Sequence, residues 1–182
     1  MQIITGKYRA RKLIGVDAST TRPTLARVKE SIFNLVQGKI DGSVVLDLFA
    51  GSGAFGVECI SRGAKKVYFV DREVKAIKTI ETNTRNMKED FEVLNMDYLS
   101  ALENFAKTNV KFDLIFLDPP YKAGFLIPAL EKLNELDLLS NEAVIVAEHE
   151  FENDLQNLPK CYIIEKSKKY GIAYVDIISK LE

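Results

Sequence analysis

The sequence predicts an α/β fold in which a mostly parallel sheet is covered by helices on both faces. Apolar segments of strand length alternate with helical segments about every 25 residues from residue 44 onward. The first apolar segment, 44–49, runs into Gly51-x-Gly53-x-x-Gly56, a pattern typical of nucleotide-binding turns. The second, 66–70, is followed by Asp71, a spacing typical of a ribose acceptor. Together these features predict a Rossmann-like arrangement.

Length and charge predict two unequal parts. The 182 residues are 47% hydrophobic, enough for one substantial core, and we expect no second large domain. Residues 1–40 hold eight Lys and Arg against two Asp and Glu, whereas 41–182 are net negative. We therefore predict a basic amino-terminal extension, 1–40, and a main domain, 41–182.

Membrane and metal functions are not expected. No apolar run reaches transmembrane length, and charges stand near the start of the sequence, so we expect a cytoplasmic protein. Cys59 and Cys161 form no CxxC pair, and the sequence has one histidine. We therefore expect two reduced thiols and no metal site.

The extension is expected to contain a ribbon and a helix. Basic residues at positions 7, 9 and 11 alternate with Tyr8 and Ala10, which predicts a β-ribbon over 2–13 with one basic face. Residues 14–23 are rich in turn formers. Apolar residues at helical spacing then predict a helix over about 25–37.

The main domain is expected to form a seven-stranded sheet. The expected strands are 44–49, 66–70, 91–95, 112–117, 143–148, 162–168 and 173–179, and the expected helices are 53–62, 73–86, 98–107 and 124–136. The βα repeats predict parallel pairing, whereas the last two strands, joined near Tyr170 and Gly171, predict an antiparallel hairpin at the carboxyl end.

Aspartates recur at the ends of the first four strands, where ligands bind in such sheets. They are Asp47, Asp71, Asp97 and Asp118. This row would repel a pyrophosphate but attract the sulfonium and ammonium of S-adenosylmethionine, so we favour that cofactor over NAD. The predicted cofactor contacts are Asp47, Phe49, Ala50, Gly51, Ser52, Gly53, Asp71, Arg72, Asp97 and Tyr98.

The run Asp118-Pro119-Pro120-Tyr121 is the most specific motif. Consecutive prolines fix the turn, so the Asp118 carboxylate and the Pro119 carbonyl become preset acceptors. Two acceptors on the N–H bonds of a nucleobase amino group would favour a tetrahedral nitrogen whose lone pair faces a methyl donor. Tyr121 could stack on the flipped base. We therefore predict these four residues to be catalytic.

At these motifs the sequence resembles class I S-adenosylmethionine-dependent methyltransferases, and specifically the RsmD family of small-subunit rRNA guanine-N2 methyltransferases. The resemblance spans nearly the whole chain and is carried by segments 3–13, 21–24, 27–30, 47–56, 61–64 and 118–121. It implies the class I methyltransferase fold, Asp47 and the 51–53 turn at the methionine end of the cofactor, Asp71 on its ribose and Asp97 near its adenine. It also implies that residues 118–121 hold a guanine of 16S rRNA.

The basic extension is the expected RNA contact, because a carboxylate-lined pocket cannot by itself attract a polyanion. The predicted RNA-binding residues are Lys7, Arg9, Arg11, Lys12, Arg22, Arg27 and Lys29. The expected partner is small-subunit rRNA or the 30S particle, bound by a monomer. His149 is expected at a surface or strand end without a catalytic role, and Lys166 to Lys169 as a solvated hairpin face.

Two other functions stay open. A DNA adenine-N6 methyltransferase would use the same turn on another amino group. The 40-residue extension is, however, small for a region that must recognise a base sequence in duplex DNA. An NAD-binding oxidoreductase would need a second nucleotide-binding half, and the carboxylate row disfavours it.

Overall fold

The computed structural model describes residues 1–16, 23–120, 123–150 and 155–181. Five α-helices occupy Pro23–Val36 (α1), Ala54–Ser61 (α2), Val74–Asn83 (α3), Tyr98–Lys107 (α4) and Leu126–Glu135 (α5), with a 3-10 turn at Gln37–Lys39 (η2). The strands are Val44–Asp47 (β1), Lys66–Asp71 (β2), Phe91–Asn95 (β3), Phe112–Leu117 (β4), Leu139–His149 (β5), Tyr162–Tyr170 (β6) and Ala173–Lys180 (β7).

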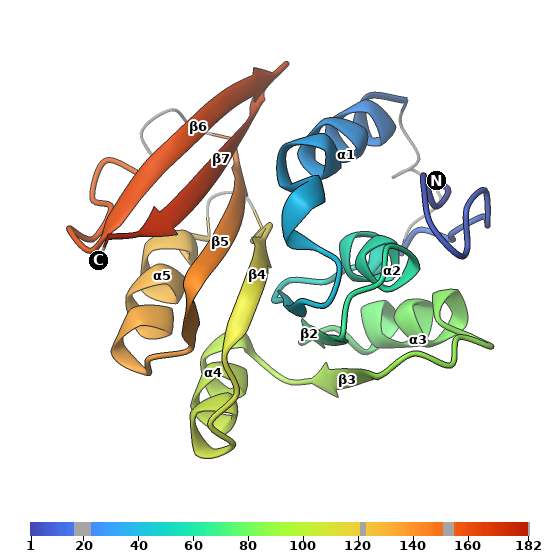
Figure 1. Ribbon diagram of the computed structural model, residues 1–182, viewed down its shortest axis with the longest axis horizontal. Helices are drawn as coiled ribbons and strands as arrows, with labels where there is room; N and C mark the ends of the chain where they lie inside the picture. The colour runs from blue at the N-terminus through green and yellow to red at the C-terminus, as the bar shows by residue number, and fades with distance from the viewer. Residues whose placement is uncertain (17–22, 121–122, 151–154, 182) are drawn as a thin grey trace.

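All seven strands form one sheet in the order β3-β2-β1-β4-β5-β7-β6 (Figure 1). β1 pairs in parallel with β2 and β4, and β5 pairs in parallel with β4. β7 is antiparallel to both β5 and β6. The strand order reverses between β1 and β4, so the carboxyl ends of these two strands flank the crevice in which such folds bind ligands.

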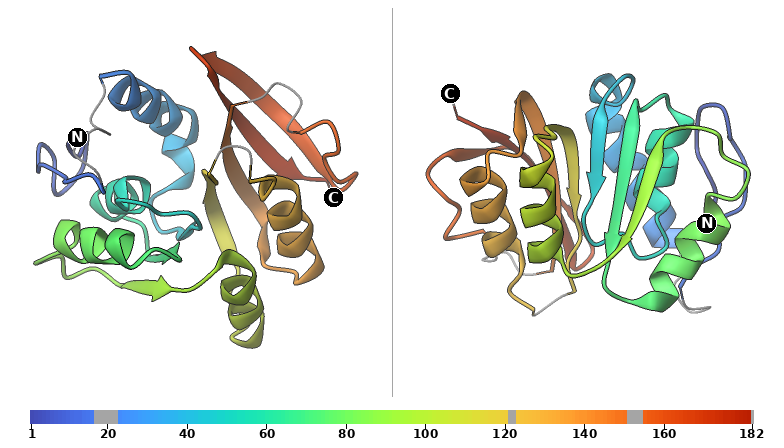
Figure 2. Two further views of the ribbon diagram at one scale, coloured as in Figure 1. Left: turned by 180° about the vertical axis from the view of Figure 1, so that it is seen from behind. Right: turned by 90° about the horizontal axis from the view of Figure 1, so that it is seen from below.

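Helices cover both faces of the sheet, as predicted (Figure 2). Side chains alternate between the faces, so Val45 of β1 packs into the core beneath α1, α2 and α3, whereas Leu46 packs into the core beneath α4 and α5. Phe33 and Ile80 are fully buried in the first core, and Leu102 in the second. Two well-filled layers therefore fix the sheet edge that carries the site.

The predicted β-ribbon is short, with an antiparallel bridge between Gln2 and Lys12 and a turn over 7–10. This segment is held mainly by α2. The buried Glu58 carboxylate accepts hydrogen bonds from the backbone N–H groups of Ile4 and Thr5 at 2.8 and 3.0 Å. Backbone hydrogen bonds between the two arms, from Ile3 N–H to the Arg11 carbonyl at 3.0 Å and from Ala10 N–H to the Ile3 carbonyl at 2.9 Å, act together with these contacts to Glu58.

Several element bounds differ from the prediction. β5 begins at Leu139, before the predicted 143, because its first residue pairs with Phe112 ahead of a register shift. The hairpin strands are also longer than predicted. Its end is tied to α1 by a hydrogen bond between the hydroxyls of Tyr170 and Ser31. The predicted lysine face is exposed at Lys166 and Lys168.

Within the described ranges, the structure has neither a helix suited in length and apolarity to crossing a bilayer nor a group of side chains suited to holding a metal ion. Cys59 is buried and Cys161 is half-buried, both as free thiols.

Candidate active site

The turn after β1 has the close backbone approach that its glycines predict. Gly51 and Gly53 adopt φ angles of 53° and 74°, which strain other residues. A Cβ on Gly56 would lie 2.2 Å from the Phe69 ring on β2. The absence of a side chain there lets α2 start directly against the sheet, which places the turn at the sheet edge.

Asp47, at the end of β1, holds the first turn of α2 through a hydrogen bond. It is buried, and its Oδ2 accepts a hydrogen bond from the Gly56 N–H at 3.0 Å. Burial raises its pKa to about 7, the Gly56 N–H opposes that rise, and the charge of Asp71 adds to it. Asp47 thus supports the turn and lines neither of the two cavities described next.

Asp71 and Asp97 shape the ends of β2 and β3. Asp71 accepts hydrogen bonds from the N–H groups of Gly51 and Glu73 at 2.8 and 2.9 Å. Asp97 caps α4 by accepting from Leu99 N–H at 3.0 Å. A hydrogen bond from the Ser100 hydroxyl, followed by one from its N–H, lowers the pKa of Asp97, so this carboxylate is held ionised.

A cavity of about 550 Å³ lies at the carboxyl ends of β1, β2, β3 and β4. Its acidic lining residues are Asp71, Glu73, Asp97, Asp118 and Glu148, and Arg72 also lines it. One wall is aromatic: the Phe49 and Tyr98 rings are 5.3 Å apart, and the Tyr98 and Phe125 rings 5.2 Å. An acidic cavity with an aromatic wall suits a cationic sulfonium nucleoside and disfavours a pyrophosphate.

The Asp-Pro-Pro turn lies where this cavity meets a second one. Asp118 and Glu148 line both. Asp118 is open to the cavities but enclosed by protein on its other sides, and this desolvation, with the charges of Glu148 and Asp47, holds its pKa well above the usual range. Pro119 is buried beside it, so the turn is fixed. The fourth predicted residue, Tyr121, lies outside the described residues.

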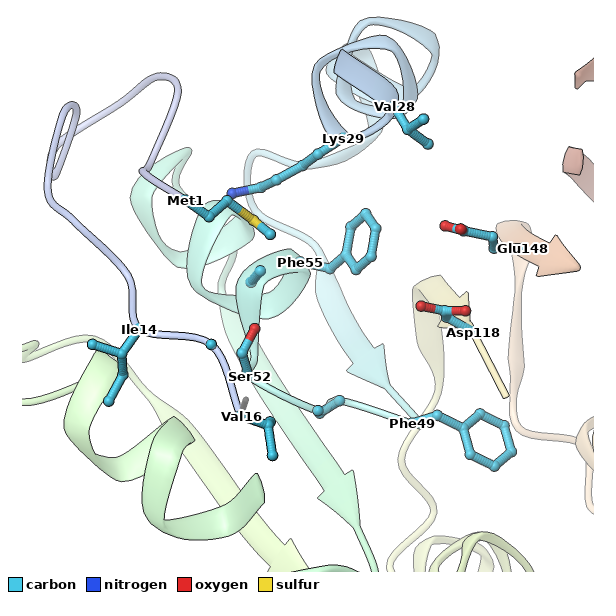
Figure 3. A pocket seen from close by; sticks show the side chains of 14 residues that line it. Met1, Ile14, Val16, Val28, Lys29, Phe49, Ser52, Phe55, Asp118 and Glu148 are labelled. Atoms are coloured by element: carbon cyan, nitrogen blue, oxygen red, sulfur yellow. The ribbon is translucent and has the colours of Figure 1, made fainter. Parts of the chain in front are cut away.

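The second, central cavity measures about 220 Å³ and lies between the glycine turn, α1 and the ends of β4 and β5 (Figure 3). Val28 and the half-buried Phe55 ring form an apolar wall opposite the carboxylates of Asp118 and Glu148 (Figure 3). Phe55 stacks on Phe116 at 4.9 Å between ring centroids. The combination of an apolar wall and acceptors suits a planar ring that carries N–H donors.

The structure brings together most of the predicted cofactor residues. Phe49, Gly51, Asp71, Arg72, Asp97 and Tyr98 line the larger cavity, and Ala50 and Ser52 line the central one. Gly53 only shapes the turn. The prediction missed Glu148 and Phe125, which line the larger cavity. It also missed Asn95. The side-chain amide of Asn95 donates hydrogen bonds to the backbone carbonyls of Asp71 and Arg72 at 3.0 and 2.9 Å.

One predicted RNA-binding residue is wrong. Lys29 is buried, and its Nζ lies 3.0 Å from Glu58 Oε2. Burial lowers its pKa, while the charge of Glu58 opposes that change. Arg62 completes this buried network with a 2.8 Å contact to Glu58. Lys29 therefore joins α1 to α2 and is withdrawn from the RNA-binding set.

The other basic residues occupy different places. Arg9 and Arg27 are exposed and line one groove of about 380 Å³ between the amino-terminal segment and α1. Lys7 contacts Glu89 at 2.5 Å, Arg11 donates to the Arg85 carbonyl, and Lys12 is exposed. Arg22 lies outside the described residues. The groove shares Met1 and Lys29 with the central cavity, so the two are adjacent.

His149 was expected at the surface or at a strand end. It is the last residue of β5 and is buried. Its ring is buried, with Nε2 2.7 Å from Asp176 Oδ2, and stacks on Tyr174 at 5.6 Å. These contacts fasten β5 to β7, so His149 has a structural position.

The raised pKa of Asp47 predicts a pH dependence of stability. Between its unfolded pKa near 3.8 and its folded value of about 7, the folded protein binds the extra proton, so the free energy of unfolding falls as pH rises. Relative to Asp47→Asn, the wild type should lose about 2.6 kcal/mol between pH 5 and pH 8, because the folded protein holds nearly one extra proton from pH 5 to pH 7. Urea unfolding of both proteins at each pH measures this difference, and parallel pH curves would contradict it.

Comparison with known proteins gives consistent results. The family model described as conserved hypothetical protein 95 matches residues 1–179. The Haemophilus influenzae protein named ribosomal RNA small subunit methyltransferase D is 36% identical over 175 residues, covering 94% of this chain and 90% of that protein. Its Escherichia coli K12 namesake is 33% identical, covering 96% and 87%. A Haemophilus influenzae crystal structure described as a methylase, HI0767, has a TM-score of 0.81 and 34% identity, covering 100% and 98%.

Proposed function

This chain belongs to the conserved hypothetical protein 95 family, the RsmD family of ribosomal RNA small subunit methyltransferases, and from that premise we propose that it methylates the N2 amino group of a guanine in 16S rRNA with S-adenosylmethionine. Among the observations, the Asp118-Pro119-Pro120 turn carries this proposal, because it places two acceptors where an acidic, aromatic-walled cavity meets an apolar one. The substrate is small-subunit rRNA or the 30S particle, bound by a monomer in the cytoplasm.

The larger cavity fits the cofactor in charge and shape. Asp71 has lone pairs remaining after its two backbone hydrogen bonds and would accept the ribose hydroxyls. Phe49, Tyr98 and Phe125 would contact the adenine. When bound, S-adenosylmethionine supplies an electrophilic methyl group and keeps the electron pair of the broken C–S bond on sulfur.

The protein's part in the reaction is to orient the amino group. The Asp118 carboxylate and the Pro119 carbonyl each accept a hydrogen bond from one N–H of this amino group. These two contacts direct the nitrogen lone pair away from the turn. The amino nitrogen forms its bond to the methyl carbon, and one of its protons then passes to Asp118, whose raised pKa suits it as the acceptor. The proton leaves from Asp118 to water.

The proposal is tested with purified protein and methyl-labelled S-adenosylmethionine, using 30S subunits from a strain that lacks this gene. The expected product is N2-methylguanosine at one 16S position, identified by nucleoside mass spectrometry. Duplex DNA is the matched alternative substrate. Label in the N6 amino group of adenine in DNA, with none in ribosomal particles, would overturn the proposal in favour of a DNA methyltransferase.

The placement of Asp71 predicts a separate effect on cofactor binding. Asp71→Ala removes the proposed ribose acceptor and the anchor of the Gly51 N–H, so affinity for S-adenosylhomocysteine should fall about ten- to a hundredfold. Asp71→Asn retains an acceptor oxygen and should lose less. Isothermal titration calorimetry measures both variants, and an unchanged dissociation constant for Asp71→Ala would remove this residue from the cofactor site.

A further inference from the structure

Glu148 stands beside Asp118 at the carboxyl edge of the sheet. β4 and β5 run in parallel with Leu117 opposite Ala147, so Asp118, which directly follows β4, lies beside Glu148, the penultimate residue of β5. Both carboxylates point into the central cavity (Figure 3). Glu148 is 7% exposed, and it also lines the larger cavity. Two adjacent strands therefore present two carboxylates at the junction of the cavities.

This pair is electrostatically costly. The charge of Glu148 is, after desolvation, the main cause of the raised pKa of Asp118. The neighbouring charge destabilises the ionised state of Asp118. A ligand that presents adjacent N–H donors to this edge would relieve the repulsion, because each carboxylate would then gain a hydrogen bond to its charged form. The site is thus suited to a donor-rich edge.

Guanine is the base whose edge has this character. Adenine, cytosine and guanine all carry an exocyclic amino group, but the ring nitrogen next to it is an acceptor in adenine and cytosine. In guanine that nitrogen, N1, carries a hydrogen. An ionised carboxylate beside the acceptor of the amino group therefore attracts guanine and faces a lone pair in the other two bases.

We propose that Glu148 accepts a hydrogen bond from N1–H of the target guanine while Asp118 and the Pro119 carbonyl hold its N2 amino group, and that Glu148 thereby selects the base. This inference rests on the proposed function and adds the residue that sets its specificity. The apolar wall of Val28 and Phe55 on the opposite side of the cavity would contact the ring face.

A base analogue separates this role from a structural one. 2,6-Diaminopurine keeps the amino group at position 2 but has a lone pair at N1. Once the target position is mapped, 16S rRNA carrying either guanine or 2,6-diaminopurine there is made by splinted ligation and assembled into 30S particles. We expect the wild type to prefer guanine by about a hundredfold or more in kcat/KM, because a lone pair facing the carboxylate replaces a hydrogen bond.

Glu148→Gln should change this preference. Its amide can donate to the N1 lone pair, so the guanine to 2,6-diaminopurine ratio should fall at least about tenfold, chiefly through a gain on the analogue. Asp118→Asn is the matched control and should slow both substrates by similar factors. Affinity for S-adenosylhomocysteine should stay within a few fold of the wild type and the melting temperature of Glu148→Gln should be no lower, which would show that the cofactor cavity and fold are intact.

Two results would overturn the inference. One is an unchanged ratio in a folded Glu148→Gln protein that still methylates guanine. The other, available even if that variant does not fold, is equal use of both bases by the wild type. Failure of the proposed function looks different, because the wild type would then leave guanine N2 in 30S particles unmethylated.

Discussion

Asp118→Ala is expected to lose methyl transfer by about a hundred- to a thousandfold in kcat while its affinity for S-adenosylhomocysteine stays within a few fold. The carboxylate lies at the junction of the two cavities, where it would contact the target amino group, whereas Asp71 and Asp97 at the far end of the larger cavity would hold the nucleoside. Single-turnover transfer and calorimetry measure the two effects separately.

The control is Asp113→Asn at the opposite end of β4, where the carboxylate accepts the Val44 N–H at 2.8 Å. It should leave kcat unchanged. The wild type should also lose kcat/KM on acidification at a higher pH than an ordinary aspartate would allow, since the raised pKa makes Asp118 protonate early. Near-normal turnover in Asp118→Ala would show that this turn does not act on the amino group.

The fold was largely predictable because its strands are short, apolar and regularly spaced. Phe91–Asn95, Tyr98–Lys107 and Phe112–Leu117 have the predicted bounds, since each begins and ends at a clear change in apolar pattern. Other bounds depend on pairing. β5 extends back to Leu139 because Phe112 is its neighbour, and a strand partner is not visible in local sequence.

Side chains of the site were predictable where they follow a strand. Glu148 is instead the last residue of the fifth expected strand, 143–148. It was missed because that carboxylate lies within the strand and belongs to no glycine or proline motif. Lys29 shows the converse error: its position in a basic segment predicted an exposed charge, but Glu58 of α2 lies against it in the interior.

Replacing Arg9 and Arg27 together with glutamate is expected to raise KM for 30S subunits by orders of magnitude, with little change in cofactor affinity or melting temperature. These two arginines come from the extension and α1, and they line one groove that is adjacent to the central cavity. Arg11 is less suitable for this test, because its guanidinium is engaged with the Arg85 carbonyl. We propose that the groove holds the RNA backbone next to the target base.

The salt dependence of RNA binding distinguishes this role from a general charge effect. Each phosphate contact contributes about 0.7 to 0.9 to the log–log slope, so the double variant should flatten it by about 1.5. Lys65→Glu with Lys107→Glu makes the same charge change elsewhere, just before β2 and at the last residue of α4, where both lysines are exposed. It should preserve the slope, since only local contacts release counterions. If the two double variants weakened RNA binding equally, net charge would be the cause, and the groove would have no part in holding the substrate.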